Sequence, residues 1–431
     1  MGMGRSGVSA AKYALSQGAR VTVTDSRRDA PQVEGARHTY GEHIRSDFTQ
    51  ADLVIVSPGI PASAPDLIAA RDAGVAVVSE LGFAAERIQA LGIPIIAVTG
   101  TNGKSSVTWF IGQLLEAAGH SVFVGGNFGT ALSDLLASED RPDFAVVEVS
   151  SYQLELPGGL APTAAVCLNL APDHLGRHGT LENYGRTKIG LFASMTSSSV
   201  AAVPKNPAAN PDGILTHGST AARRLWLDDK PGLSRVHSIV TLTGTADDGT
   251  IDLSGLRLLG EHNRDNAAAA ALMCVAVGVP RSAIDMSCLT ALPHRLEPVL
   301  ETNGVTWVND SKATNVDAAI VGIDGIDRPL IVLLGGAGKP GADYGRLQPS
   351  LAENTRRVIC FGDARNDIAQ ALSATNVDQV STLSDAVYAA ASLAKAPDVV
   401  LLSPACASFD EFNNFEERGV AFAALAKEVS Q

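Results

Sequence analysis

The sequence predicts an α/β protein of three domains, with Rossmann-like domains at both ends and a central domain that combines a phosphate-binding loop with a mainly parallel sheet. Its 431 residues suffice for roughly two to four domains of ordinary size. Short apolar runs alternate with helical patterns, which is typical of parallel sheets covered by helices. The alternation begins anew twice along the chain, so we expect domains at residues 1–90, 91–292 and 293–431.

The expected elements follow from the spacing of the apolar residues. In the first domain they are a helix at 8–17 and strands at 21–24, 53–56 and 75–78. In the second they are strands at 95–98, 121–124, 144–149 and 165–168, with helices at 105–118 and 264–277. In the third they are strands at 331–334, 358–361 and 399–402. The segment 196–254 is rich in Ser, Thr, Gly and Asp, so we expect loops and short strands on the surface there.

The composition argues against several classes of function. A net charge of −13 repels nucleic acid and anionic membranes at long range. The five cysteines are scattered without metal-ligand spacing, which favours a reducing compartment over a disulfide framework. No cleavable signal opens the chain, and its most apolar uncharged stretch, 266–279, is shorter than the ~20 residues that span a bilayer. We therefore expect a cytoplasmic protein with no nucleic-acid partner and no membrane insertion. We take it to be a monomer, although the composition does not decide the oligomeric state.

A glycine-rich loop lies between the expected strand at 95–98 and the helix at 105–118. Its residues are Gly100, Thr101, Asn102, Gly103, Lys104, Ser105 and Ser106. Backbone N–H groups at such a helix start point at phosphate oxygens, Lys104 supplies a cation to the β- and γ-phosphates, and Ser105 supplies a hydroxyl for Mg²⁺. The spacing is unusual, because Val98 stands where the common P-loop pattern has its first glycine. The alternative is a glycine-rich turn with an incidental lysine.

Further polar residues follow the other central strands. Glu148 ends a buried strand, the position at which a P-loop sheet carries a magnesium ligand, although a helix-capping carboxylate is the alternative. Asp173 and His174 follow the next strand, at the sheet edge where parallel sheets bind ligands. Lys188 comes fourteen residues after His174 and could equally be a plain surface lysine.

The central motifs, taken in order, resemble those of the Mur ligases. They are Gly100–Ser106, Gly126-Asn127-Phe128-Gly129, Glu148-Val149-Ser150-Ser151, Asp173-His174 and Lys188. Motifs of the third domain are similar to those of the family members that add D-glutamate. They are Pro293-His294-Arg295, Asn309-Asp310-Ser311-Lys312-Ala313-Thr314-Asn315, Gly335-Gly336-Ala337-Gly338-Lys339, the segment 402–410 and Asn414-Phe415-Glu416-Glu417-Arg418-Gly419. The resemblance covers essentially the whole chain.

This resemblance implies an ATP-dependent ligase whose three domains bind a UDP moiety, ATP and the incoming amino acid. It implies UDP-N-acetylmuramoyl-L-alanine and D-glutamate as substrates, with an acyl phosphate formed between them. It also implies ATP and Mg²⁺ as cofactors, and CO₂ bound as a carbamate on Lys188. A carboxylate has no good leaving group for attack by an amine, and phosphorylation supplies one.

The resemblance also assigns roles to individual residues. The catalytic residues would be Lys104, Glu148, His174 and Lys188, and the metal ligands Ser105, Glu148, His174 and carbamylated Lys188. ATP would be bound by the glycine loop with Asn263, Asn266, Arg295, Asp310 and Lys312. The UDP substrate would contact Arg5, Ser6, Asp25, Ser26, Arg27, Ser57, Pro58, Gly59, Asn127 and Ser151, and D-glutamate would contact Thr314, Lys339, Ser408 and Phe415. Asn263 and Asn266 could also cap their helix.

The N-terminal glycine motif leaves an alternative open. Gly2, Gly4 and Gly7 match G-x-G-x-x-G, with Asp25 after the next expected strand, which is the dinucleotide fingerprint of an NAD-dependent oxidoreductase. The same turn serves a UDP pyrophosphate, and the second phosphate loop favours that interpretation. The strand that normally precedes the motif is missing, so we expect roughly four to eight apolar residues encoded upstream. A related ligase such as a folylpolyglutamate synthetase and a non-catalytic nucleotide-binding module are the remaining alternatives.

Overall fold

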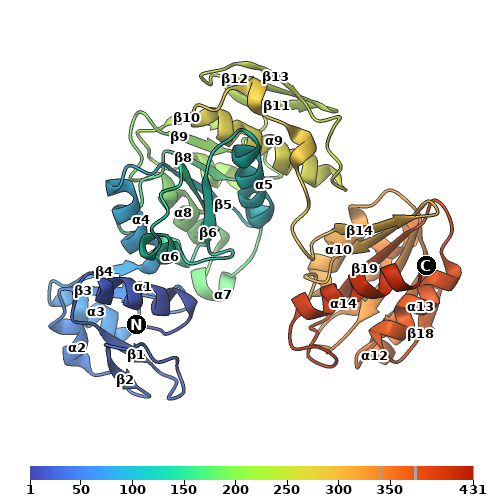
Figure 1. The fold of residues 1–431 in the computed structure, drawn as a ribbon, viewed down its shortest axis with the longest axis horizontal. Helices are drawn as coiled ribbons and strands as arrows, with labels where there is room; N and C mark the ends of the chain where they lie inside the picture. The colour runs from blue at the N-terminus through green and yellow to red at the C-terminus, as the bar shows by residue number, and fades with distance from the viewer. Residues whose placement is uncertain (340, 373–375, 431) are drawn as a thin grey trace. The chain divides into compact units, whose positions relative to one another are not determined.

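The computed structural model describes residues 1–339, 341–372 and 376–430. The chain divides into two compact units, one of residues 1–256 with 265–289 and one of residues 257–264 with 290–431 (Figure 1). Within the described residues, no helix is both long enough and apolar enough to cross a membrane.

The N-terminal part of the first unit holds two small parallel sheets. One pairs β1 (Thr22–Asp25) with β2 (Arg37–Tyr40), and the other pairs β3 (Leu53–Val56) with β4 (Ala76–Ser79). Residues 1–3 connect them, because the Met1 amine donates to Ile55 O at 2.8 Å and Gly2 N donates to Thr24 O at 2.8 Å. The helices are α1 (Arg5–Ser16), α2 (Arg45–Thr49), α3 (Pro65–Asp72) and α4 (Glu80–Ala90). The expected parallel strands are confirmed, and β2 is an addition that its polar sequence concealed.

The first unit also contains a nine-stranded sheet in the order β13-β12-β11-β10-β9-β8-β5-β7-β6. Its parallel strands are β5 (Ile95–Thr99), β6 (Val122–Gly126), β7 (Phe144–Glu148), β8 (Ala164–Cys167), β9 (Val200–Val203), β10 (Arg223–Trp226) and β11 (Gly232–Val236). β12 (Ile239–Thr243) and β13 (Gly249–Asp252) extend it antiparallel. The helices α5 (Lys104–Ala117), α6 (Leu132–Ala137), α7 (Leu175–His178) and α8 (Leu181–Ile189) belong to this part, and α9 (Glu261–Ala276) follows β13.

The expectation that segment 196–254 forms surface structure is wrong for β9. All four residues of this strand are buried, and Leu225 of the neighbouring β10 is fully buried as well. The polar residues that flank each strand dominate the composition of the segment. Only the pairing of β9 with β8 shows that the parallel sheet continues into it. The expected short strands themselves are confirmed.

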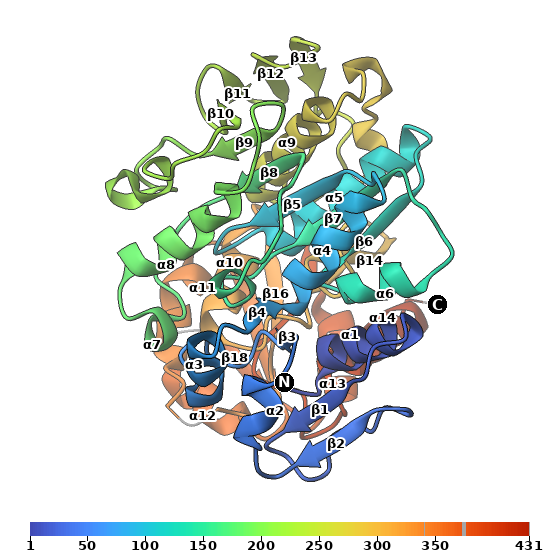
Figure 2. The same cartoon turned by 90° about the vertical axis from the view of Figure 1, so that its left-hand side faces the viewer.

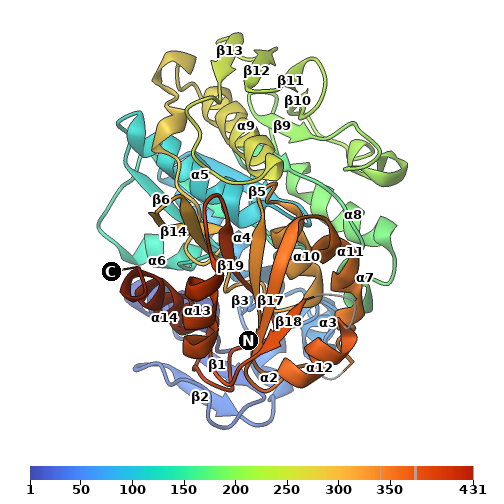
Figure 3. The same cartoon turned by 90° about the vertical axis from the view of Figure 1, so that its right-hand side faces the viewer.

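The second unit is a six-stranded sheet in the order β14-β15-β19-β16-β17-β18. Its strands are β14 (Glu297–Thr302), β15 (Val305–Asn309), β16 (Leu330–Gly335), β17 (Thr355–Phe361), β18 (Val377–Gln379) and β19 (Val399–Ala405), and only β14 pairs antiparallel. Helices α10 (Val316–Asp324), α11 (Gln348–Asn354) and α12 (Arg365–Ala371) cover one face, and α13 (Leu383–Leu393) and α14 (Phe415–Glu428) cover the other (Figure 3). Alternate residues of β16 enter the two cores, as the two-residue period of a strand requires.

Candidate active site

Four loops meet at one edge of the nine-stranded sheet. They follow β6, β7, β5 and β8. These four parallel strands are adjacent in the sheet in this order, although the chain forms them in a different order. The carboxyl ends of parallel strands lie on the same edge, so the loops bring together Asn127, Glu148, the glycine loop and the segment 169–174. The site residues that the sequence predicts for the central domain therefore lie at the same edge of the sheet.

The glycine loop has the geometry of a phosphate-binding loop. β5 is entirely buried, and α5 begins at Lys104 directly after the loop. Gly103 has φ +82°, and a Cβ there would lie 2.7 Å from the side-chain oxygen of Asn266, so only glycine fits. Lys104 Nζ donates to Thr101 O at 2.7 Å, within its own loop. The expected strand, loop and helix are thus confirmed.

Asn169 holds this loop in shape and is a residue that the sequence analysis did not assign. Its side-chain oxygen accepts from Asn102 N at 2.9 Å and from Thr101 N at 3.2 Å, and its amide donates to Asn102 O at 3.1 Å. Thr101 Oγ1 also accepts from Ala171 N at 3.0 Å. Asn169 lies two residues after the end of β8. Its position at the carboxyl end of a parallel strand was the sequence feature that could have identified it.

We expect Asn169→Ala to raise the KM for ATP roughly tenfold, because the loop loses hydrogen bonds worth about 1–2 kcal/mol. Steady-state phosphate release against ATP concentration measures this. Asn206→Ala is the matched control, since Asn206 shapes a loop of the same unit through Ala208 N. An unchanged KM for ATP in Asn169→Ala would show that the loop keeps its shape without this side chain.

Glu148 is buried at the end of β7 and is only half satisfied. Its Oε1 accepts from Asn127 Nδ2 at 2.6 Å, while its buried Oε2 has no hydrogen-bond partner among the described residues. Asn127 N also donates to Glu148 O at 2.9 Å. Burying a carboxylate oxygen without a partner costs free energy, and a bound cation would compensate for this cost. The structure therefore places Asn127 against Glu148, and its contact with the UDP substrate stays a prediction.

Lys188 is one of the most deeply buried side chains of the protein, at 1% exposure. Its Nζ donates to Gly100 O at 2.7 Å and lies 4.3 Å from the centre of the Tyr184 ring. The pKa of Lys188 is lowered to about 8, chiefly by burial; the charge of Lys104 acts in the same direction, while Cys167, Asp173 and Glu148 act against it. The alternative of a plain surface lysine is therefore wrong.

His174 lies near this group, with its ring centre 6.1 Å from that of Tyr184. It has φ +53° and is exposed, its Nε2 lies 3.3 Å from Asp173 Oδ2, and its Nδ1 is 3.2 Å from the Tyr152 hydroxyl. Across the described residues, no three His, Cys, Asp or Glu side chains gather closely enough to hold a metal ion. Ser151, assigned to the UDP substrate, bonds to His178 Nε2 at 3.0 Å. The four-residue metal set stays a prediction.

The N-terminal glycine motif forms the close turn that its spacing predicts. A Cβ at Gly7 would lie 1.9 Å from the Gly2 carbonyl oxygen. Asp25 accepts from Met3 N at 2.7 Å and pairs with Arg27, and this guanidinium holds the pKa of Asp25 well below its usual range. Ser57 Oγ donates to Gly2 O at 2.7 Å. The loops after β1 and β3 thus adjoin the turn, as a shared binding pocket would require.

The loops of the N-terminal motif are tied to the central part of the unit. Arg5 donates to Gly129 O at 2.5 Å, and Ser9 Oγ donates to Asp134 where α1 lies beside α6 (Figure 2). Glu155 and Arg177 form a largely buried ion pair at 2.7 Å, and Arg177 also donates to Ile60 O at 3.1 Å. The sequence analysis missed this pair, because no local pattern connects residues that far apart.

The second unit gathers its predicted residues at the carboxyl ends of β15, β16 and β19. Lys312 Nζ lies 5.8 Å from the centre of the Phe415 ring, and Ala337 N donates to Ala407 O at 2.9 Å. This contact brings the segments of Lys339 and Ser408 side by side. Lys339 also lines an open cavity with Tyr344 and three aspartates, Asp343, Asp363 and Asp367.

Asp310 is buried in the second unit, whereas a residue that contacts ATP directly is expected to be accessible. Its oxygens accept from Leu296 N at 3.2 Å and Ser403 Oγ at 2.8 Å, and burial raises its pKa to about 7. Asn263 Nδ2 donates to Leu259 O at 2.7 Å, so this bond is not a helix cap, in which the side-chain oxygen would accept from an N–H group. The ATP contacts of Asn263, Asn266, Arg295 and Asp310 stay predictions.

Three family models match the chain in order. They describe a Mur ligase MurD-like N-terminal domain at residues 1–79, a Mur ligase middle domain at 98–274 and a Mur ligase glutamate ligase domain at 294–406. This chain belongs to the Mur ligase family. The oxidoreductase and the non-catalytic module are therefore rejected, and the mixed α/β fold with mainly parallel sheets is confirmed.

Individual relatives narrow the match within the family. The UDP-N-acetylmuramoylalanine--D-glutamate ligase of Anaeromyxobacter dehalogenans (strain 2CP-C) is 40% identical over 455 residues, which span 100% of this chain and 97% of that protein. The protein of the same name from Escherichia coli O6:H1 (strain CFT073) is 37% identical over 444 residues, again spanning 100% and 97%.

Solved structures share the fold at much lower identity. MurF from Acinetobacter baumannii superposes with a TM-score of 0.61 at 18% identity, over 82% of each chain. MurC from Thermotoga maritima has a TM-score of 0.58 at 16% identity, over 99% of this chain and 97% of that one. Folylpolyglutamate synthase from Mycobacterium tuberculosis has a TM-score of 0.58 at 17% identity, over 79% and 95%. These likenesses establish the fold alone.

Proposed function

We propose that this chain is a UDP-N-acetylmuramoylalanine–D-glutamate ligase, which uses ATP to join D-glutamate to UDP-N-acetylmuramoyl-L-alanine during synthesis of the peptidoglycan precursor. The observation that carries the proposal is the full-length match to ligases of that name at up to 40% identity. The cluster of Lys104, Glu148 and Lys188 around the glycine loop supports it. We place the enzyme in the cytoplasm, as a monomer.

In the first half-reaction, a carboxylate oxygen of the L-alanine residue attacks the γ-phosphorus of ATP. The new bond joins this oxygen to phosphorus, the bond from phosphorus to the β–γ bridging oxygen breaks, and ADP leaves. The N–H groups of the glycine loop and Lys104 hold the phosphates, so that two anions approach each other at a site of positive potential. The glycine loop keeps the shape that Asn169 imposes.

Magnesium fits this site, because Glu148 offers a buried oxygen without a partner and Ser105 offers a hydroxyl at the start of α5. Oxygen donors of this kind suit Mg²⁺. When bound, the ion neutralises phosphate charge and polarises the phosphoryl oxygens. We assign Ser105 to a Mg²⁺ at the ATP phosphates, and Glu148, His174 and carbamylated Lys188 to a second Mg²⁺ near the acyl phosphate.

The environment of Lys188 supports a carbamate. Only the neutral amine adds CO₂, and a pKa of about 8 leaves a substantial neutral fraction near physiological pH. The nitrogen lone pair attacks the carbon of CO₂, and one amine proton is lost to solvent. The product carries a negative charge where the amine carried a positive one, and Lys104 is close enough to stabilise it.

In the second half-reaction, the amine of D-glutamate attacks the acyl carbon. Phosphate leaves through a tetrahedral intermediate, and the amine proton is released. We assign the D-glutamate carboxylates and backbone to Thr314, Lys339, Ser408 and Phe415, with the ATP contacts of the second unit at Arg295, Asp310 and Lys312. The UDP part of the other substrate would lie at the N-terminal turn, near Arg5, Ser6, Ser26 and the segment 57–59.

Phosphate release with ATP, UDP-N-acetylmuramoyl-L-alanine and one amino acid at a time tests this proposal. We expect release with D-glutamate, and none above background with L-glutamate, L-lysine or meso-diaminopimelate. Equal release with another amino acid would assign the chain to a different ligase of the family. Folate substrates with L-glutamate test the folylpolyglutamate alternative in the same assay.

A further inference from the structure

Arg418 is a fully buried cation that the proposed reaction does not use. It lies in the first turns of α14 at 0% exposure and is the largest fully buried side chain in the described residues. The guanidinium makes five hydrogen bonds, all to neutral oxygens. They are Nε to Ser311 Oγ at 2.9 Å, Nη2 to Ser311 O at 2.9 Å, Nη1 and Nη2 to Cys406 O at 3.2 Å each, and Nη1 to Ala407 O at 3.0 Å.

These contacts join the three segments that carry the predicted amino-acid site. Ser311 lies three residues before Thr314, and Ala407 directly precedes Ser408. Ser311 Oγ in turn donates to Phe415 O at 2.8 Å. The segment that contains Lys339 is connected to the other three by the hydrogen bond from Ala337 N to Ala407 O. A single side chain thus fixes the ends of β15 and β19 and the start of α14 relative to one another.

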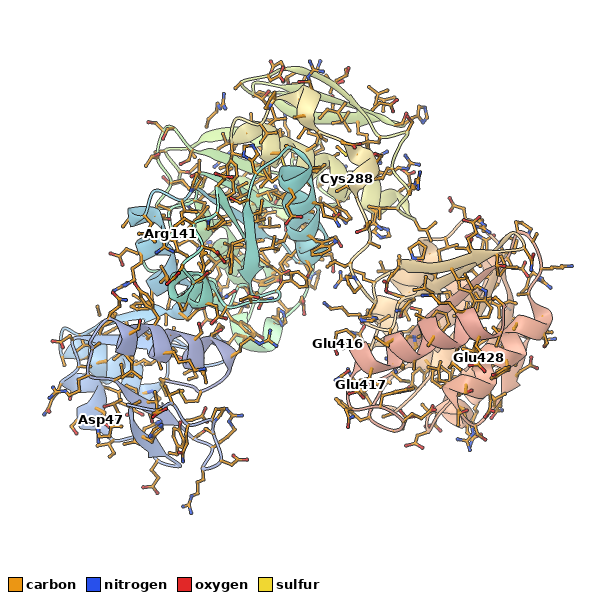
Figure 4. All side chains as sticks on the ribbon, in the orientation of Figure 1. Asp47, Arg141, Cys288, Glu416, Glu417 and Glu428 are labelled. Atoms are coloured by element: carbon orange, nitrogen blue, oxygen red, sulfur yellow. The ribbon has the colours of Figure 1, made fainter. Side chains whose placement is uncertain are left out.

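Among the residues that the structure describes, no carboxylate contacts Arg418 and cancels its charge. Asp410 and Glu411 are the nearest acidic groups, but Asp410 accepts from Asp363 N and Glu411 accepts from Leu383 N. Glu416 and Glu417 lie exposed at the start of α14, and Glu428 lies near its end (Figure 4). Burial lowers the pKa of Arg418 to about 10, so the group stays protonated at neutral pH.

We propose that Arg418 is a positioning residue of the D-glutamate site, which locks the loops that receive the amino acid and supplies from beneath them a positive charge that favours a dicarboxylate. Hydrogen bonds to four neutral oxygens satisfy its donors while leaving the charge available. Lys312 and Lys339 carry the same sign on neighbouring segments. This inference rests on the proposed function.

Two variants distinguish the effect of the Arg418 charge from the effect of its hydrogen bonds. Arg418→Gln removes the charge, and Arg418→Lys keeps it, yet neither can reproduce the five hydrogen bonds. We expect Arg418→Gln to raise the KM for D-glutamate roughly 10- to 100-fold, on the scale of hydrogen bonds to charged groups. The rise in Arg418→Lys should be several-fold smaller. The KM for ATP and the burst of ADP formed without D-glutamate should stay within about twofold of wild type in both.

Lys427→Gln is the matched control, because it removes one positive charge from an exposed position near the end of the same helix. Equal increases in the KM for D-glutamate in the two Arg418 variants would show that the charge has no part. A parallel rise in the KM for ATP would show general damage to the domain and overturn the assignment. If Arg418→Gln does not fold, Arg418→Lys decides alone: a wild-type KM for D-glutamate contradicts the proposal. A wild-type enzyme that is inert with D-glutamate would refute the proposed function instead.

Discussion

Replacing Lys188 by alanine is expected to lower turnover roughly a thousandfold or more, on the several-kcal/mol scale of metal-ion catalysis. The substitution removes the amine that would carry the carbamate and the hydrogen bond from Nζ to Gly100 O in the glycine loop. Rescue by a small carboxylate distinguishes the loss of the carbamate from the loss of this hydrogen bond. Formate or acetate can occupy the space with a negative charge but cannot donate to Gly100, so partial recovery of phosphate release supports the carbamate.

The controls for Lys188 use salt and a second lysine. Sodium chloride at matched ionic strength should give no rescue, and Lys205→Ala should keep wild-type turnover because Lys205 is an exposed partner of Asp229. A Lys188→Ala enzyme with wild-type turnover would refute the carbamate role.

Reactivation of wild-type enzyme after removal of CO₂ adds a dependence on pH. The folded-state pKa of Lys188, about 8, lies below the ordinary lysine value, so the neutral amine accumulates as pH rises through about 8. At a fixed concentration of dissolved CO₂, reactivation should therefore be faster above about pH 8 than near pH 6.5. A rate that does not change with pH would argue against carbamylation of this amine.

Glu148→Gln is the second substitution with a large expected effect. Glutamine keeps an oxygen that can accept from Asn127 Nδ2, so the side chain retains its observed contact. It loses the negative charge at the buried Oε2, which has no hydrogen-bond partner within the part of the chain that the structure describes. We expect turnover to fall roughly 100- to 1,000-fold and the Mg²⁺ concentration for half-maximal activity to rise at least tenfold.

Glu80→Gln is the matched control for Glu148. Glu80 is also buried in the first unit, and it also has one oxygen without a partner. Burial raises its pKa, so a neutral amide should replace it at little cost. The control should leave the Mg²⁺ dependence unchanged. A Glu148→Gln enzyme that saturates with Mg²⁺ like wild type would remove Glu148 from the set of metal ligands.

The sequence by itself determined the elements that carry the chemistry. A run of apolar residues at 95–98, then glycines, then a helical pattern predicts a phosphate loop, because burial and backbone conformation act locally. β3 was predicted to the residue, and the cluster of family motifs identified the class of protein. The same local rules placed Glu148 at a strand end.

Only the tertiary structure decided which of these elements are neighbours and which charges are buried. β5 lies between β7 and β8, and this order brings Glu148 and Asn169 to the glycine loop from about 50 to 70 residues away. β9 was misjudged and β15 was missed, because each is a short apolar run between polar residues and only its pairing with neighbouring strands shows that it is buried. In α14 the sequence pattern does not distinguish Arg418 from an exposed arginine. Its burial follows from the loops that fold over it, since a charged group enters a core only where fixed oxygens replace its water.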